Sequence, residues 1–336
     1  MNTFKKIGLT ALAGSLVATS LVAGEMAVTG SASMKVRHVD TNSAGKAFSM
    51  GNQLAFKGSG ELDNGLDVSL SFVLDQNDDT YTDKNVAADV LNGKTTTTGK
   101  GAPFDSHSVS IGSDALGTLV FHGEGGSSAE SALDTTAAGD LWDNGYGIST
   151  SNDPSASATS DNMIFYTLPE LADGIAITAS YTPRGKGAVD SSSALGLVYT
   201  GFDGLSVSLG QGENNSSAGA TADATTMKVS YAISSFTFGY SDHEFDSQTA
   251  SKDQDVKSMN VSYTLTEDIS ISYGQDEIAK PSVGGDQDIK VSAISGSYTT
   301  GGMTLGAMVG DAENNAHGTG ANEDKEMWHI TASFAF

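Results

Sequence analysis

The amino-acid sequence predicts an all-β protein, a transmembrane antiparallel up-and-down β-barrel of about sixteen strands. Three observations predict it. Apolar and polar residues alternate along most of the chain after residue 24, as in strands with one apolar face. Short turns alternate with long polar loops, which is the pattern of a barrel with short periplasmic turns and long extracellular loops. The chain also ends on an aromatic strand that a closed barrel requires and a soluble domain rarely uses.

The final strand, residues 326–336, shows the strictest alternation. Trp328, Ile330, Ala332, Phe334 and Phe336 share one face. A barrel must pair its last strand with its first, because unpaired backbone in lipid is costly. We therefore predict that 326–336 pairs antiparallel with 25–39 and that Phe336 points outward. The alternative is the last strand of a soluble sandwich.

The N-terminus has the pattern of a secretory signal peptide. Lys5 and Lys6 precede an apolar and small-residue stretch at 7–23, and small residues at 22–24 offer a cleavage site. The mature chain is expected to start at Glu25, which assigns 1–24 to the signal peptide and 25–336 to the barrel. The alternative is an N-terminal membrane anchor. No other stretch reaches the roughly 18 apolar residues of a spanning helix.

The charge and cysteine content exclude several protein classes. The formal net charge is −24, and loss of Lys5 and Lys6 with the signal peptide would make it more negative still. Such a chain is not a general nucleic-acid binder, which presents a basic face, and it attracts cations. Cysteine is absent, so the chain has no disulfide framework and no thiolate metal site.

The first half of the mature chain reads as hairpins separated by two long loops. Asn64-Gly65 lies between the alternating runs 48–58 and 66–74 and is a strong hairpin signal. A second hairpin is expected from 105–112 and 117–123. Residues 75–104 read as a long polar loop. Residues 124–161 break all periodicity and are too long for an idle connection in a compact domain, so they are either disordered or a functional loop.

The second half is a repeat. Tyr166, Tyr199, Tyr231, Tyr263 and Tyr298 recur at intervals of 33, 32, 32 and 35 residues, and each precedes a short turn and a new strand. A propeller blade would need about four strands in a period of this size, whereas this unit has two. The tyrosines fit an aromatic girdle at a membrane interface, or simple β-propensity. A barrel of about eight hairpins leaves an aqueous channel.

Three motifs carry a resemblance to a known family. They are Phe56-Lys57-Gly58 with Asn64-Gly65-Leu66, the segment 161–174 around Tyr166 and Pro169, and the terminal Phe336. In this order they resemble the general porins of Gram-negative outer membranes, over essentially the whole mature chain. The resemblance implies a homotrimer in the cell outer membrane, surrounded by lipid and lipopolysaccharide. It also implies a third long loop, here 124–160, folded into the lumen as a constriction, and a role for Phe336 as an assembly signal.

The resemblance further implies which residues line the pore. Acids of the constriction loop would face a basic cluster on the opposite wall; the loop acids are Glu124, Glu130, Asp134, Asp140, Asp143 and Asp153. Three positions where the family tends to place arginine hold Gln53, His107 and Thr159 instead. Lys35, Arg37 and Lys57 have lumen parity and are candidates to replace them in part. Because fixed positive charge is reduced, we expect a preference for cations.

Enzymatic and metal functions find little support. The six histidines are scattered and none has the spacing of a zinc motif. We therefore expect no enzyme and no cofactor; a barrel lipase is the specific alternative. Asp75, Asn77 and Asp79 are a weak candidate for divalent binding, but Thr80 and Val86 replace the glycine and acid of a calcium loop. The predicted function is passive diffusion of ions and small hydrophilic solutes, and the alternative is a structural or adhesive barrel with a plugged lumen.

Overall fold

A computed structural model describes residues 25–40, 45–76, 105–143, 147–148, 161–183, 191–215, 221–280, 287–318 and 324–336. The predicted signal peptide and three predicted site residues, Asn77, Asp79 and Asp153, lie outside these ranges, as does Thr159. Asp75, the first residue of the predicted divalent site, is described and lies on the strand Asp67–Gln76 in the wall of the barrel.

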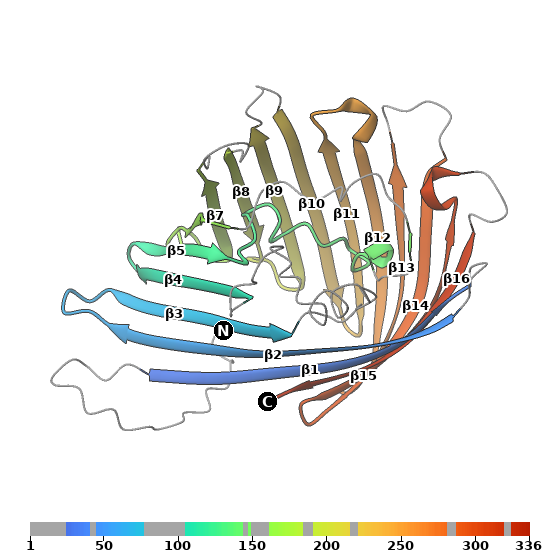
Figure 1. Cartoon of the computed structure of the whole chain (residues 1–336), viewed down its shortest axis with the longest axis horizontal. Coiled ribbons are helices and arrows are strands. Elements are labelled where there is room, and N and C mark those ends of the chain that lie inside the picture. The colour runs from blue at the N-terminus through green and yellow to red at the C-terminus, as the bar shows by residue number, and fades with distance from the viewer. Residues whose placement is uncertain are drawn as a thin grey trace, which may run out of the picture.

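Sixteen β-strands appear in the described ranges and form one closed sheet. The first eight are β1 (Glu25–Val39), β2 (Gly45–Glu61), β3 (Asp67–Gln76), β4 (Ser106–Ser113), β5 (Gly117–Glu124), β6 (Met163–Thr167), β7 (Ile175–Thr182) and β8 (Ser191–Tyr199). The others are β9 (Leu205–Asn215), β10 (Thr221–Ile233), β11 (Phe236–Asp246), β12 (Gln254–Thr266), β13 (Ile269–Ala279), β14 (Ile289–Thr300), β15 (Met303–Glu313) and β16 (Lys325–Ala335). Every strand pairs with its sequence neighbour, so the predicted up-and-down antiparallel barrel is confirmed (Figure 1).

The barrel closes where β1 meets β16. The two strands pair antiparallel from Ser31 with Ala335 to Val39 with Met327, as predicted. Phe336 extends this pairing, since its backbone exchanges hydrogen bonds of 2.7 and 2.9 Å with Gly30. Its side chain is 73% exposed on the outer face, and its ring fills the space that a Cβ at Gly30 would need. The terminal aromatic residue therefore covers the seam.

Connections differ in length at the two ends of the barrel. One end, here called the turn end, has short connections at 62–66, 114–116, 168–174, 200–204, 234–235, 267–268 and 301–302. The other, the loop end, carries the longest connections, which follow β3 and β5, together with shorter ones such as 216–220. At Gly65 the backbone adopts a φ of 80°, a conformation open to glycine, which explains the Asn64-Gly65 turn signal. The alternation of short turns and long loops predicted from the repeat is confirmed.

The outer face of the wall is apolar and the inner face is polar over most strands. Large apolar side chains such as Phe48, Ile294 and Val309 are exposed on the outside. Tyr231, Tyr263 and Tyr298 also point outward, each beside a short turn, at the positions predicted for an aromatic girdle. Water can therefore fill the lumen while the outside faces lipid.

Helical structure in the described ranges is restricted to single turns. These are η2 (Leu141–Asp143), η3 (Ala250–Lys252) and η4 (Asn315–His317). In the part of the chain described, no helix has the length and apolar content of a membrane span. Of the three, η2 matters for function, because it lies on the connection that follows β5.

Candidate pore constriction

The connection after β5 folds into the barrel. Its longest described stretch, residues 125–143, is here called the constriction loop; it crosses the inside of the wall in Figure 1. Serine hydroxyls and one carboxylate on four strands accept hydrogen bonds from its backbone N–H groups. The pairs are Ala129 to Ser180 Oγ on β7 (2.9 Å), Ala137 to Ser241 Oγ on β11 (2.9 Å), Ala138 to Ser258 Oγ on β12 (2.9 Å) and Leu141 to Asp276 Oδ2 on β13 (2.7 Å).

These contacts satisfy backbone donors that the irregular loop cannot pair by itself. Ser241, Ser258 and Asp276 are at most 2% exposed, so the loop shields them from water. The predicted folding of this segment into the lumen agrees with these contacts. Its role as the narrowest part of the pore stays a prediction.

Glycines on the inner wall make room for the loop. A Cβ at Gly210 on β9 would lie 3.1 Å from Cγ of Glu130, and one at Gly274 on β13 would lie 2.8 Å from Cβ of Ala138. At Gly196 on β8 a Cβ would meet the Ala129 carbonyl oxygen at 2.6 Å. Side chains at these positions would push the loop away from the wall, so these strand glycines permit its close approach.

An apolar cluster anchors the far end of the loop. Leu141 and Trp142 of η2 are 7% and 9% exposed, and they pack on inward side chains of β12–β16. Those partners are Val256, Ile278, Ile289, Val291, Ala293, Met308, Ala312 and Met327. The lumen therefore contains a small hydrophobic core on one side, which holds the loop against that side.

Glu130 is buried and does not line the pore as the sequence predicted. It is 0% exposed, and the Thr226 hydroxyl on β10 donates to its Oε1 at 2.6 Å. His243 Nδ1 on β11 lies 3.1 Å from the same hydroxyl oxygen. Because that hydroxyl has one proton and donates it to Glu130, His243 donates to it through Nδ1–H. This carboxylate anchors the loop instead of facing water.

Asp134 and Asp140 meet a positive charge on the wall behind the loop. The Lys228 ammonium on β10 donates to the Thr135 carbonyl at 2.7 Å and interacts electrostatically with both aspartates. Asp140 also braces the loop locally, since its Oδ1 accepts from the Thr136 N–H and its own N–H donates to Thr136 Oγ1, both at 2.8 Å.

Asp143, the last residue of η2, is the loop acid that meets a lysine of β1. It is exposed, and it interacts electrostatically with Lys35 on β1, which Arg37 accompanies on the same face. The register of β1 and β2 places Lys35, Arg37, Gln53 and Lys57 on the lumen face, as their parity predicted. Their role in the pore stays a prediction.

His107 lies on the outer face, so its assignment to the pore is wrong. It pairs with Phe72 in the outward row of β3, and its ring fills the space beside Gly123. It shares its parity with the apolar Val109 and Ile111, whereas Ser108 and Ser110 face the lumen. The family comparison placed it one residue out of phase, and a shift of one residue in a strand reverses the face. Glu124 is the last residue of β5, where the loop leaves the wall.

The sequence did not identify the wall residues that hold the loop. Thr226, Lys228, Ser241, Ser258 and Asp276 occur in alternating strands where inward polar residues are common. Their parity indicated the lumen, but nothing in the local pattern showed which of them the loop would cover.

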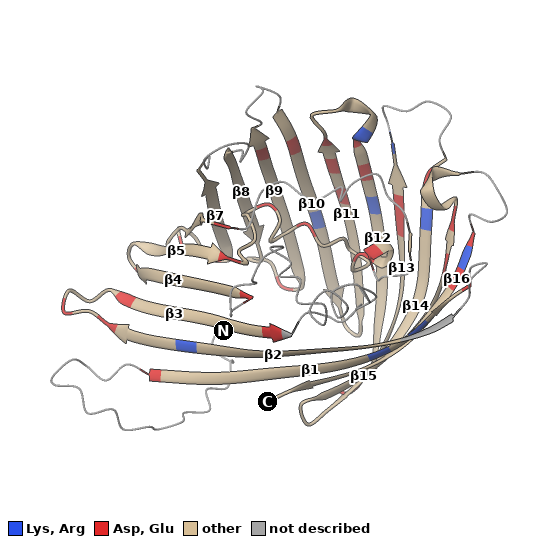
Figure 2. Cartoon of the chain, viewed as in Figure 1, with Lys and Arg blue, Asp and Glu red and all other residues tan. Residues whose placement is uncertain are grey.

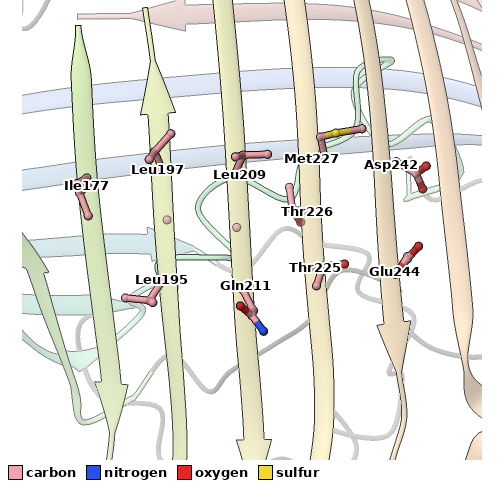
Figure 3. Close-up of a pocket in the computed structure, with 12 residues that line it drawn as sticks. Ile177, Leu195, Leu197, Leu209, Gln211, Thr225, Thr226, Met227, Asp242 and Glu244 are labelled. Carbon is pink, nitrogen blue, oxygen red and sulfur yellow. The ribbon is translucent and has the colours of Figure 1, made fainter. Parts of the chain in front are cut away.

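Two cavities lie on opposite faces of the barrel wall. A polar cavity of about 590 Å³ lies inside, along β1–β5, where Lys57, Ser59, Ser69 and Ser110 line it with other polar groups. A groove of similar volume lies on the outer face of β7–β11 (Figure 3). Ile177, Leu195, Leu197, Leu209 and Met227 make the groove apolar, so it belongs to the lipid-facing surface.

A closed barrel with an inward-folded third loop can be compared with known proteins. A family model described as Gram-negative porin matches residues 8–288. The chain belongs to the Gram-negative porin family. It is therefore an outer-membrane porin, a channel, in a family whose fold serves passage and not catalysis.

Solved porin structures share its architecture at low sequence identity. A loop L8 deletion mutant of OmpT from Vibrio cholerae is 15% identical, covers 94% of this porin and 100% of its own chain, and gives a TM-score of 0.68. OmpF from Salmonella typhi is 12% identical, with coverage of 94% and 98% and a TM-score of 0.67. A mutant of the Rh. blastica porin is 13% identical, with coverage of 93% and 100% and a TM-score of 0.64. A comparison with curated proteins gives no match.

Proposed function

We propose that this porin is an open channel for passive diffusion of ions and small hydrophilic solutes. The observation that carries the proposal is the inner cavity that the constriction loop leaves open. The loop's hydrogen bonds and apolar anchor join it to β7 and β10–β16, and a cavity of about 590 Å³ remains along β1–β5. That cavity is lined by serine hydroxyls and charged groups, which suit hydrated solutes.

The competing function is a structural or adhesive barrel with a plugged lumen. A plug would fill the lumen from wall to wall, whereas a cavity of about 590 Å³ remains on the inner face of β1–β5. In that part of the chain the inner serines of the opposite wall pair with each other, as Ser69 and Ser110 do at 2.6 Å. This supports an open passage.

Cation preference is the finer part of the proposal. The full chain holds 41 acids against 17 lysines and arginines, and Gln53 stands on the lumen wall where the family tends to have arginine. Excess negative charge in a narrow, low-dielectric passage concentrates cations. Lys35, Arg37 and Lys57 oppose this effect, and screening over about 8 Å at physiological salt limits the influence of acids on the outer loops.

Purified protein in a planar bilayer tests both statements. We expect stepwise single-channel conductance in KCl. Across a KCl gradient at low salt, we expect a reversal potential whose sign shows that K⁺ permeates more than Cl⁻. The absence of conductance steps would favour the plugged barrel. A reversal potential of the opposite sign would support the channel and contradict the cation preference.

Export and assembly complete the proposal. We infer that residues 1–24 are removed, which mass measurement of a mature chain starting at Glu25 would test. The exposed apolar outer face, with Phe48, Leu54 and Leu70 on the N-terminal strands, supports a homotrimer surrounded by outer-membrane lipid and lipopolysaccharide. The mass of the complex extracted in mild detergent tests the trimer, and co-purification of lipopolysaccharide tests the lipid partner.

A further inference from the structure

One lysine stands behind the constriction loop, on the wall to which the loop is attached. Lys228 lies on the lumen face of β10, paired with Ser208 of β9 and Ser241 of β11. Its Nζ donates to the Thr135 carbonyl at 2.7 Å, which fixes the ammonium at the back of the loop. It is the single basic residue of β10, visible as the blue band on that strand in Figure 2.

The position of Lys228 matters because of the charges on either side of Thr135. Four loop acids are described between residues 130 and 143. Glu130 is buried against Thr226, and Asp143 interacts with Lys35 of β1. The other two, Asp134 and Asp140, both interact electrostatically with Lys228. One cation thus opposes half of these loop acids.

We propose that Lys228 is a specificity-determining residue of the pore, which sets the ratio of cation to anion permeability by compensating Asp134 and Asp140. This inference rests on the proposed diffusion function and assigns selectivity to a residue outside the opposite-wall cluster. Removing the ammonium removes a positive charge that offsets the negative charge of both aspartates. A unit charge about 6 Å from a permeating ion in water changes its local occupancy by about threefold.

The loop keeps its position without Lys228, because it has other attachments. Backbone bonds to Ser180, Ser241, Ser258 and Asp276, together with the packing of η2, hold it independently. The substitution Lys228→Met therefore changes charge at nearly constant shape and separates selectivity from pore size.

The experiment compares wild-type protein and variants in planar bilayers. For Lys228→Met we expect the K⁺ to Cl⁻ permeability ratio, from reversal potentials at low salt, to rise at least about threefold. Conductance in 1 M KCl should stay the same, since charges there are screened over about 3 Å. Lys228→Arg should keep the wild-type ratio.

Two further variants make the result specific. Lys257→Met removes an exposed lysine from the outer face of β12 and should leave the ratio unchanged. Adding Asp134→Asn to Lys228→Met should bring the ratio back toward wild type. An unchanged ratio in Lys228→Met, or a rise in its conductance at 1 M KCl, would overturn the inference. If wild-type protein forms no channel, the proposed function fails first and this inference fails with it.

Discussion

At the scale of single residues, the constriction loop depends on polar groups that its own folding buries. Glu130, His243 and Asp276 are each 0% exposed, and each lies between the loop and the wall. A buried ionisable group is tolerated when hydrogen bonds replace its lost water. Thr226 supplies that replacement for Glu130 and connects it to His243. For the stability of this buried contact, the hydroxyl of Thr226 is therefore more important than its methyl group.

Thr226→Val tests this at nearly constant volume. Loss of the hydroxyl leaves a buried carboxylate oxygen without its donor, and we expect a loss of about 1–3 kcal/mol in the free energy of unfolding. The urea midpoint of the protein in detergent measures it. Thr226→Ser should retain most of the stability. Thr225→Val, on the exposed outer face of the same strand, is the matched control. Equal effects at 225 and 226 would show that the hydrogen bond contributes nothing.

At the scale of elements, the constriction loop and the inner faces of β12–β16 stabilise each other. The strands present aliphatic side chains to the lumen, where a water-filled barrel normally presents polar ones. Leu141 and Trp142 cover them, so the loop completes a core that the strands began. The loop end of this side of the lumen is consequently filled, whereas a cavity of about 590 Å³ remains along β1–β5.

Excising residues 129–142 with a short Gly-Ser link should increase single-channel conductance, because the loop occupies part of the lumen. The same deletion exposes Ile278, Ile289 and Val291 to water, so the midpoint temperature of thermal unfolding should also fall. Shortening the connection between β11 and β12, at 247–253, is the control, because it lies outside the constriction loop. Conductance that stays constant after the excision would mean that the loop does not limit the pore.

At the scale of the whole molecule, closure depends on a short seam. The pairing of β1 and β16 joins the two ends of the chain, and Phe336 continues it by two hydrogen bonds to Gly30. The ring of Phe336 lies over Gly30, where any side chain would displace it. Without this closure, two strand edges would face lipid with unpaired backbone groups.

Deleting Phe336 should therefore reduce the amount of folded protein in the outer membrane. The variant loses two backbone hydrogen bonds at the seam and the aromatic cover over Gly30. The heat-modifiable band on electrophoresis, compared with total protein, measures folded yield. Phe202→Ala removes a similarly exposed aromatic residue from the turn between β8 and β9 and should assemble normally. Wild-type yield after deletion of Phe336 would refute the assembly role.

The sequence by itself determined the wall of the barrel. Strand parity is a local property with a period of two, so alternation at 326–336 and 25–39 was enough to assign inner and outer faces and to predict their pairing. The turn at Gly65 and the outward Tyr231, Tyr263 and Tyr298 followed from equally local signals. Even His107 could have been placed correctly, because it alternates in phase with Val109 and Ile111.

Only the tertiary structure decided what happens inside the wall. The path of the constriction loop has no period, and its contacts join residues far apart in the sequence, such as Leu141 and Asp276, which are 135 positions apart. Whether a loop acid is buried like Glu130, close to Lys228 like Asp134 or close to Lys35 like Asp143 depends on which wall residue the loop meets. That choice is made by packing and charge between distant segments, which no local pattern encodes.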